Sequence, residues 1–206
     1  MLTRRVLLPT AVVAALVSVG AVQAQDAFNR DPARASAGTY TLDPAHSKIT
    51  WSVNHFGFST YTGQFAGGTG TLTIDPKAPS AARLDVTVDA TQVGTLNKAL
   101  DDHLKSGDFL DVANHPTARF QSTRVVRTGE RTADVQGQLT LRGVTKPVTL
   151  KATFNQSGVN PVDKAYSLGF DATAKIKRSE FGVSYAVPGV SDEVTLHLEG
   201  EFKAKS

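Results

Sequence analysis

The stretch GQLTLRGVTKPVTLKATF, residues 137–154, decides the fold. Apolar and polar residues alternate through 137–141, and after a short break they alternate again through 148–154. A period of two is what a strand with one dry face and one wet face requires. Gly143 allows the positive φ of a tight turn, and Pro147 suits the entrance of a strand because it cannot donate to a ladder. The stretch therefore predicts an antiparallel hairpin whose dry face either packs in a core or lines a cavity.

The same alternation recurs along most of the chain. Glycines interrupt it within 56–74, and glycines inside strands mark the bulges and bends by which a sheet curls toward closure. The further segments predicted as strands are 39–42, 48–55, 56–74, 84–88, 120–125, 166–177 and 194–202.

One segment breaks this period. Leu96, Leu100 and Leu104 recur every four residues, which places them on one face of a helix. Thr95 is the predicted N-cap, and Gly107 ends the run. The sequence thus predicts one short amphipathic helix whose leucines pack against the sheet.

These elements together predict an all-β fold. About eight one-sided strands with glycine-rich bends and one helix favour a closed, eight-stranded antiparallel barrel. A two-layer sandwich is the alternative, because alternation alone does not separate the two architectures.

The amino-acid composition excludes several classes of function. The 206 residues are 40% apolar and 20% charged, which is typical of one globular domain. Without Arg4 and Arg5 of the N-terminal leader, 20 basic residues stand against 19 acidic ones, and this near neutrality argues against a nucleic-acid partner. The chain has no cysteine, which excludes disulfides, thiol catalysis and cysteine-ligated metal centres.

The N-terminus has the features of an export signal. In residues 1–24 two arginines precede an apolar run that ends in VQA, so we expect a secretory signal peptide cleaved near Ala24. An uncleaved anchor helix is the alternative, and the choice between the general and the twin-arginine export route stays open. Residues 25–38, small and polar, are predicted as a flexible tail, and residues 39–206 as the folded domain.

Four blocks of sequence resemble one known family. They read YTLDPAHSKITWSVNHFGFS at 40–59, DDHLKSGDFLDVANHPTARFQS at 101–122, GQLTLRGVTKPVTL at 137–150 and IKRSEFGV at 176–183. In this order and at these separations they resemble the YceI-like polyisoprenoid-binding proteins. The resemblance implies a lipocalin-like barrel, a periplasmic location, and a long apolar ligand such as an isoprenoid quinone or polyprenyl phosphate. It also favours a homodimer. Because a bilayer buries a prenyl chain as well as the barrel does, we expect transient membrane contact for lipid exchange.

An eight-stranded barrel is just wide enough to hold one slender ligand. The dry faces mix small and large residues, and the small ones leave room for a chain. The residues predicted to line such a cavity are Trp51, Val53, Phe58, Phe120, Leu139, Leu150, Phe154, Phe170 and Ala172.

Three polar residues are candidates for contact with a ligand head group. His55 ends a strand, His103 lies in the predicted helix, and Arg178 sits at a strand end where its planar fork could meet a phosphate or a quinone carbonyl. For Arg178 the alternative is a salt bridge to Asp108 or Asp111. Arg142 and Lys146 are interpreted as solvated turn charges.

No motif indicates a metal, a cofactor or catalysis. The five histidines share no metal-ligand spacing, and the chain contains no nucleophile elbow, phosphate loop or dinucleotide fingerprint. The favoured function is therefore a lipid carrier that is not an enzyme. Two alternatives remain: an enzyme acting on a lipid or quinone through His55, His103 or Arg178, and a solid barrel that serves as an interaction module in envelope stress.

Overall fold

The computed structural model describes residues 28–205, so the predicted signal peptide lies outside the described residues. The described chain is built almost wholly of strands. They are β1 (Phe28–Asn29), β2 (Gly38–Leu42), β3 (Lys48–His55), β4 (Ser59–Phe65), β5 (Thr69–Ile74), β6 (Arg83–Asp89), β7 (Val93–Gly94), β8 (Thr117–Arg127), β9 (Thr132–Leu141), β10 (Val144–Val159), β11 (Tyr166–Lys177) and β12 (Glu193–Ala204). The helix is α1 (Lys98–Lys105), and the short 3₁₀ turns are η1 (Pro32–Arg34), η2 (Pro79–Ala81), η3 (Ala90–Gln92) and η4 (Arg178–Phe181).

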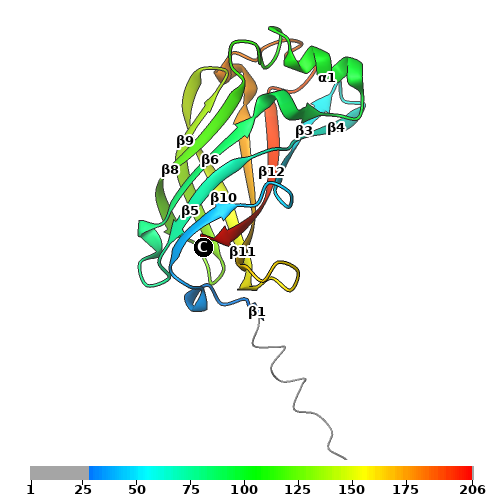
Figure 1. Cartoon of the computed structure of the whole chain (residues 1–206). Helices are drawn as coiled ribbons and strands as arrows, with labels where there is room; N and C mark the ends of the chain where they lie inside the picture. The colour runs from blue at the N-terminus through cyan, green and yellow to red at the C-terminus, as the bar shows by residue number, and fades with distance from the viewer. Residues whose placement is uncertain (1–27, 206) are drawn as a thin grey trace, which may run out of the picture.

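Eight strands close into a ring in the order β10, β9, β8, β6, β5, β2, β12 and β11, and β11 pairs back to β10. All of these pairings are antiparallel. The prediction of a closed eight-stranded antiparallel barrel with one helix is therefore confirmed, and the sandwich is not formed. Figure 1 shows α1 at one end of the barrel and β1 at the other. We call these the helix end and the β1 end.

Strand β12 belongs to two parts of the wall. Its last residues pair with β2, whereas its first half pairs with β3, which continues into β4 and β7. The wall therefore divides at the helix end, and α1 lies across that end after β7 (Figure 1). No helix among residues 28–205 is long and apolar enough to cross a lipid bilayer.

The hairpin that decides the fold forms as predicted, with one difference. Leu141 pairs with Val144 across a two-residue turn, in which Arg142 and Gly143 have φ of 49° and 75°. Pro147 lies inside β10 rather than at its entrance. This position tolerates proline because β11 pairs with β10 only from Lys151 onward, so no ladder on that side needs a donor from Pro147.

The helix begins two residues later than predicted. Asn97 is the N-cap, and its side chain accepts a hydrogen bond from the amide of Leu100. Thr95 instead donates through both its amide and its hydroxyl to Asp101. Leu96 therefore precedes the helix, at φ 65°, and is fully exposed rather than part of the leucine stripe.

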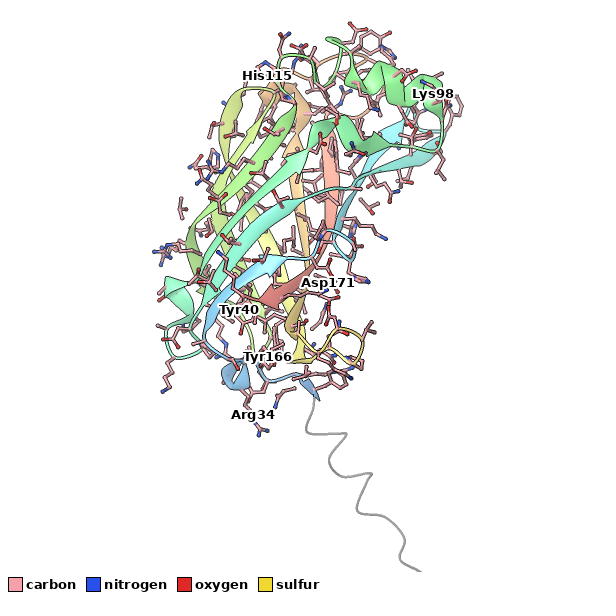
Figure 2. The ribbon with its side chains drawn as sticks, in the orientation of Figure 1. Arg34, Tyr40, Lys98, His115, Tyr166 and Asp171 are labelled. Atoms are coloured by element: carbon pink, nitrogen blue, oxygen red, sulfur yellow. The ribbon has the colours of Figure 1, made fainter. Side chains whose placement is uncertain are left out.

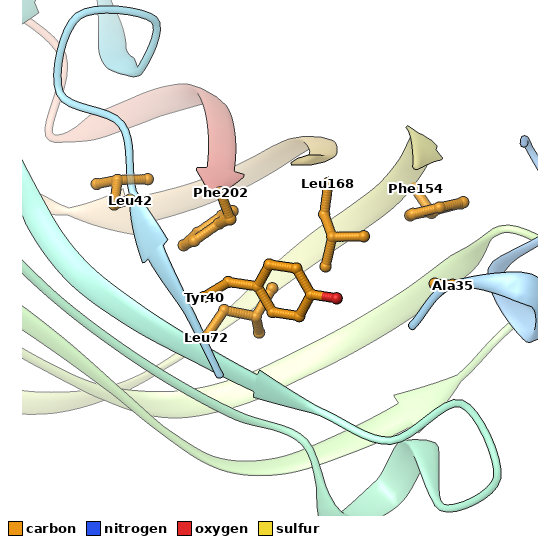
Figure 3. Packing of buried hydrophobic residues seen from close by; sticks show 7 residues of the cluster. All are labelled: Ala35, Tyr40, Leu42, Leu72, Phe154, Leu168 and Phe202. Carbon is orange, nitrogen blue, oxygen red and sulfur yellow. The ribbon is translucent and has the colours of Figure 1, made fainter. Parts of the chain in front are cut away.

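The described part of the predicted flexible tail is docked on the barrel. Phe28 pairs with Gly158 of β10, and Ala35 is buried in the core. The hydroxyl of Tyr40 donates to the carbonyl of Ser36 at 2.7 Å, which ties this segment to β2. Figure 3 shows Ala35 and Tyr40 in the cluster that fills the β1 end. Residues 28–38 are mostly small and polar, yet a few of them find partners in the fold, and such contacts are enough to order a polar segment.

Candidate functional site

The helix-end half of the barrel encloses an apolar cavity of about 650 Å³, which we call the main cavity. Ligand pockets for small molecules typically have volumes of about 300–1,000 Å³. Five of the residues predicted as cavity walls line it: Trp51, Val53, Phe120, Leu139 and Leu150. They come from four different strands, and the period of two turns each of them inward.

Four predicted wall residues lie elsewhere. Phe58 is 90% exposed in the turn after β3, outside the barrel. Phe154, Phe170 and Ala172 face inward but lie deeper, toward the β1 end, and border smaller pockets. Alternation indicates which face of the sheet a residue occupies, and it carries no information on how far along the barrel axis that residue lies.

One lid of the main cavity is α1. Leu100 and Leu104 line the cavity from the helix, so the predicted amphipathic face packs over the barrel end. The segment between β11 and β12 forms a second lid, with Val183 and Tyr185 among its lining residues. Figure 2 marks this end by Lys98 of α1 and by His115, opposite Arg34 at the β1 end.

Two of the predicted head-group residues lie on the wall of the main cavity at the helix end. His103 Nε2 lies 2.9 Å from Asp108 Oδ2, and its ring makes edge contacts with Phe109 and Tyr185 at centroid distances of 4.9 and 5.1 Å. His55 makes an edge contact with Phe56 at 4.8 Å. Both imidazoles are thus held by aromatic rings beside an apolar space.

Arg178 also borders the main cavity, but its side chain holds the second lid. The guanidinium is buried, and it donates to four backbone carbonyls. They belong to Val183, Tyr185, Val190 and Ser191, at 2.8–3.0 Å. Burial lowers the pKa of Arg178, an effect that the nearby Asp192 carboxylate opposes. The predicted alternative, a salt bridge to Asp108 or Asp111, is not formed, because carbonyls of its own loop occupy the guanidinium.

Arg142 has a structural role that its turn position concealed. It donates to the carbonyls of Gly182 and Gly107, and therefore joins the β9–β10 turn to the second lid and to the end of the helix segment. The interpretation of Arg142 as a solvated turn charge is wrong. Its partners are 40 and 35 residues away in sequence, so no local pattern could identify them.

Sequence reasoning missed the aromatic residues at the opening of the cavity. Phe56 and Tyr185 line the main cavity and are 54% and 49% exposed, so the cavity reaches the surface beside them. Both lie in segments that are not strands, where the period of two gives no signal. The one sequence feature that could have indicated these two residues is an aromatic side chain close to glycine or proline in a predicted loop.

A cluster of possible metal ligands lies outside the main cavity, between the loop after β2 and the second half of β12. Its oxygen and nitrogen atoms, from Asp43, His46 and Glu201, lie within 4.8 Å of one another. The ammonium of Lys203 contacts the Asp43 carboxylate at 2.7 Å. The chain thus supplies its own cation to this cluster.

Known proteins resemble this chain in sequence and in fold. The YceI-like domain family matches residues 40–202. A UPF0312 protein of Pseudomonas aeruginosa is 41% identical over 170 residues, which cover 82% of this chain and 88% of the relative. The crystal structure of Burkholderia cenocepacia BcnA superimposes with a TM-score of 0.71 at 25% identity, covering 78% of this chain and 98% of BcnA.

A third likeness concerns the fold alone. A polyisoprenoid-binding domain from Saccharophagus degradans has a TM-score of 0.61 at 14% identity, covering 82% of this chain and all of that domain. The family match, over residues 40–202, spans the barrel and the lids of its main cavity. The chain therefore belongs to the YceI-like family.

Proposed function

We propose that this protein is a periplasmic lipid carrier that holds a long isoprenoid chain in the main cavity, with the head group near His55 and His103. The observation that carries the proposal is an apolar space of about 650 Å³ that reaches the surface beside Phe56 and Tyr185. The Saccharophagus domain of the same fold is described as polyisoprenoid-binding, which supports this class of ligand.

Besides holding the second lid, Arg178 contributes its positive charge to the proposed site. Its donors hold the lid, so the guanidinium acts on a ligand as a fixed positive charge at the cavity wall and favours an electron-rich or anionic head group. We propose binding and release without a chemical step. The residues around the cavity offer apolar contacts and a fixed charge to a ligand, and these suffice for binding.

The free energy of burying the lipid favours its exchange with membranes over its permanent retention in the barrel. Burying one five-carbon prenyl unit contributes about 4 kcal/mol, at about 0.8 kcal/mol per carbon. A bilayer provides the same gain, so the protein competes with it only through shape and head-group contacts. We therefore propose transient membrane contact at the helix end, and export directed by residues 1–24. A mature N-terminus at Gln25 is the measurable consequence of the export proposal.

Mass spectrometry of lipids extracted from natively purified protein tests the binding proposal. The wild type is expected to carry a prenyl lipid. Leu139→Glu places a charge in the cavity wall and is expected to lower the bound lipid at least tenfold, because a charge in an apolar site disfavours the chain. Gln138→Glu is the matched control, since the neighbouring side chain is exposed on the same strand.

Two outcomes would contradict the proposal. A wild-type protein that carries no lipid and takes up no added prenol would exclude a lipid carrier. Equal lipid content in Leu139→Glu and Gln138→Glu, with both variants folded by circular dichroism, would place the lipid outside the main cavity.

A further inference from the structure

We propose that Phe170 is the stop that limits the length of the chain held in the barrel. This inference rests on the proposed lipid-binding function and names the residue that selects among chains of different length. Phe170 is the register partner of Phe154 on β10 and of Gly200 on β12, so it stands on the inner wall below the main cavity.

Two smaller pockets meet at Phe170. An intermediate pocket of about 100 Å³ adjoins the main cavity and shares Leu84, Val86 and Leu150 with it. A β1-end pocket of about 140 Å³ lies beyond, bordered by Ala35 and Ala152. Phe170 borders both of the smaller pockets. Among residues 28–205, the β1-end pocket and the main cavity share no wall residue.

Neighbouring rings fix the position of Phe170. Its ring packs against Phe154 at a centroid distance of 5.3 Å and an angle of 62°, and against Phe202 at 6.1 Å and 80°. Both of these neighbours are buried, with 5% exposure each. Phe154 and Phe202 belong to the cluster that fills the β1 end, seen in Figure 3. Phe170 is therefore held as a rigid partition between the spaces above and below it.

Small residues leave space on both sides of this partition. Ala172 lies one inward position above Phe170 on β11 and borders the intermediate pocket, whereas the space at Gly200, opposite on β12, is taken by the ring of Phe202. Ala152 borders the space on the other side. The ring of Phe170, held by Phe154 and Phe202, therefore lies between a space above it and a space below it, which is the placement that a steric stop requires.

The volumes set the expected length limit. An apolar cavity of about 150 Å³ holds one benzene molecule, so about 25 Å³ is needed per carbon. On this scale the main cavity of about 650 Å³ and the intermediate pocket of about 100 Å³ together accommodate about 30 carbons, or about six prenyl units. The β1-end pocket of about 140 Å³ would hold about one unit more if Phe170 were removed.

Competition binding with prenols of three to nine units tests the stop. A bound fluorescent fatty acid serves as the displaced probe. For the wild type, affinity is expected to rise up to about six units and then stop rising. For Phe170→Ala, the rise is expected to continue by about one unit, so that a seven-unit prenol binds at least tenfold more tightly relative to a six-unit prenol than it does in the wild type.

Two further variants separate length selection from general damage. Leu139→Ala, in the main cavity wall, is expected to weaken all lengths without moving the limit. Ala152→Leu fills the β1-end pocket and is expected to leave the wild-type limit unchanged, yet to restore that limit when combined with Phe170→Ala. If Phe170→Ala fails to fold, Phe170→Leu retains an apolar contact and is expected to shift the limit by a smaller amount.

The outcomes distinguish this inference from the function on which it rests. An unchanged limit in folded Phe170→Ala and Phe170→Leu would overturn the stop while leaving lipid binding intact. A wild type that binds no prenol of any length would overturn both. Saturated alcohols of the same lengths are expected to show the same limit, and a limit confined to prenols would overturn a purely steric stop.

Discussion

Arg178 illustrates how a single buried charge can organise a site. A buried guanidinium needs partners for its donors, and here carbonyls of the second lid provide them. The same contacts fix the position of Tyr185, whose ring lies at the opening of the main cavity. Order in the lid and charge at the cavity wall therefore depend on one residue.

At the residue scale, Asp43 should make stability depend on acid pH. Hydrogen bonds from Lys203 and then from His46 lower the pKa of Asp43 from 3.8 to about 2. Because the folded pKa lies below the unfolded one, this contribution is present above about pH 4 and is lost as pH falls toward 2. Asp43→Asn is expected to cost about 1–3 kcal/mol of unfolding free energy at pH 7.

Urea unfolding followed by circular dichroism from pH 7 to pH 2 measures this effect. Asp43→Asn should show a flatter dependence between pH 4 and pH 2 than the wild type. Asp85→Asn is the control, because the Asp85–Arg119 pair is exposed and such pairs contribute about 0–1 kcal/mol. Equal acid dependence in the wild type and Asp43→Asn would contradict the assignment.

At the scale of elements, α1 is a lid of eight residues, and a helix this short depends on its cap and its packing. Its leucines make it part of the cavity, whereas its other face is polar. An unstable lid would open the main cavity to water, so the local stability of α1 bears directly on ligand retention.

Asn97→Ala should therefore loosen this lid. Loss of the cap is expected to cost about 1 kcal/mol. Hydrogen exchange of the α1 amides is expected to accelerate, with little change in the barrel strands. Lys98→Ala, which removes an exposed ion pair with Asp102, is the matched control and should have a much smaller effect. Faster exchange in Lys98→Ala than in Asn97→Ala would show that Asn97 is not the working cap.

At the scale of the whole molecule, the two ends of the barrel differ. The β1 end is closed by a packed cluster and the docked N-terminal segment, whereas the helix end carries the cavity opening. Two largely or fully exposed apolar residues belong to segments at this end: Phe58 in the turn after β3, and Leu96 just before α1. Exposed apolar side chains beside a lipid site suit contact with a bilayer surface.

Phe58→Ser is accordingly expected to slow lipid transfer between vesicles several-fold without changing the equilibrium affinity for prenol. The control is Val162→Ser, which changes an equally exposed apolar residue in the β10–β11 loop at the β1 end. Transfer of a fluorescent prenol from donor to acceptor vesicles measures the rate. Equal slowing by both substitutions would argue against the helix end as the contact surface.

Closure into a barrel instead of a sandwich was decided by the pairing of β11 with β10, whereas the family followed from four blocks of sequence and the helix from leucines spaced four residues apart. The sequence by itself determined the β architecture. It did so because the period of two is a local property that every strand carries in its own residues, as in β9 and β10. The inward positions of Trp51, Phe120 and Leu139 followed from the same local rule.

Only the tertiary structure decided where along the barrel each inward residue lies and what the loops contribute. Phe120 and Phe170 have the same local pattern, yet one lines the main cavity and the other stands below it as a partition. Depth is set by strand register and ring closure, which join residues far apart in the chain. The partners of Arg178 and Arg142 likewise arise from the folding of distant segments onto each other, a relation that no local pattern records.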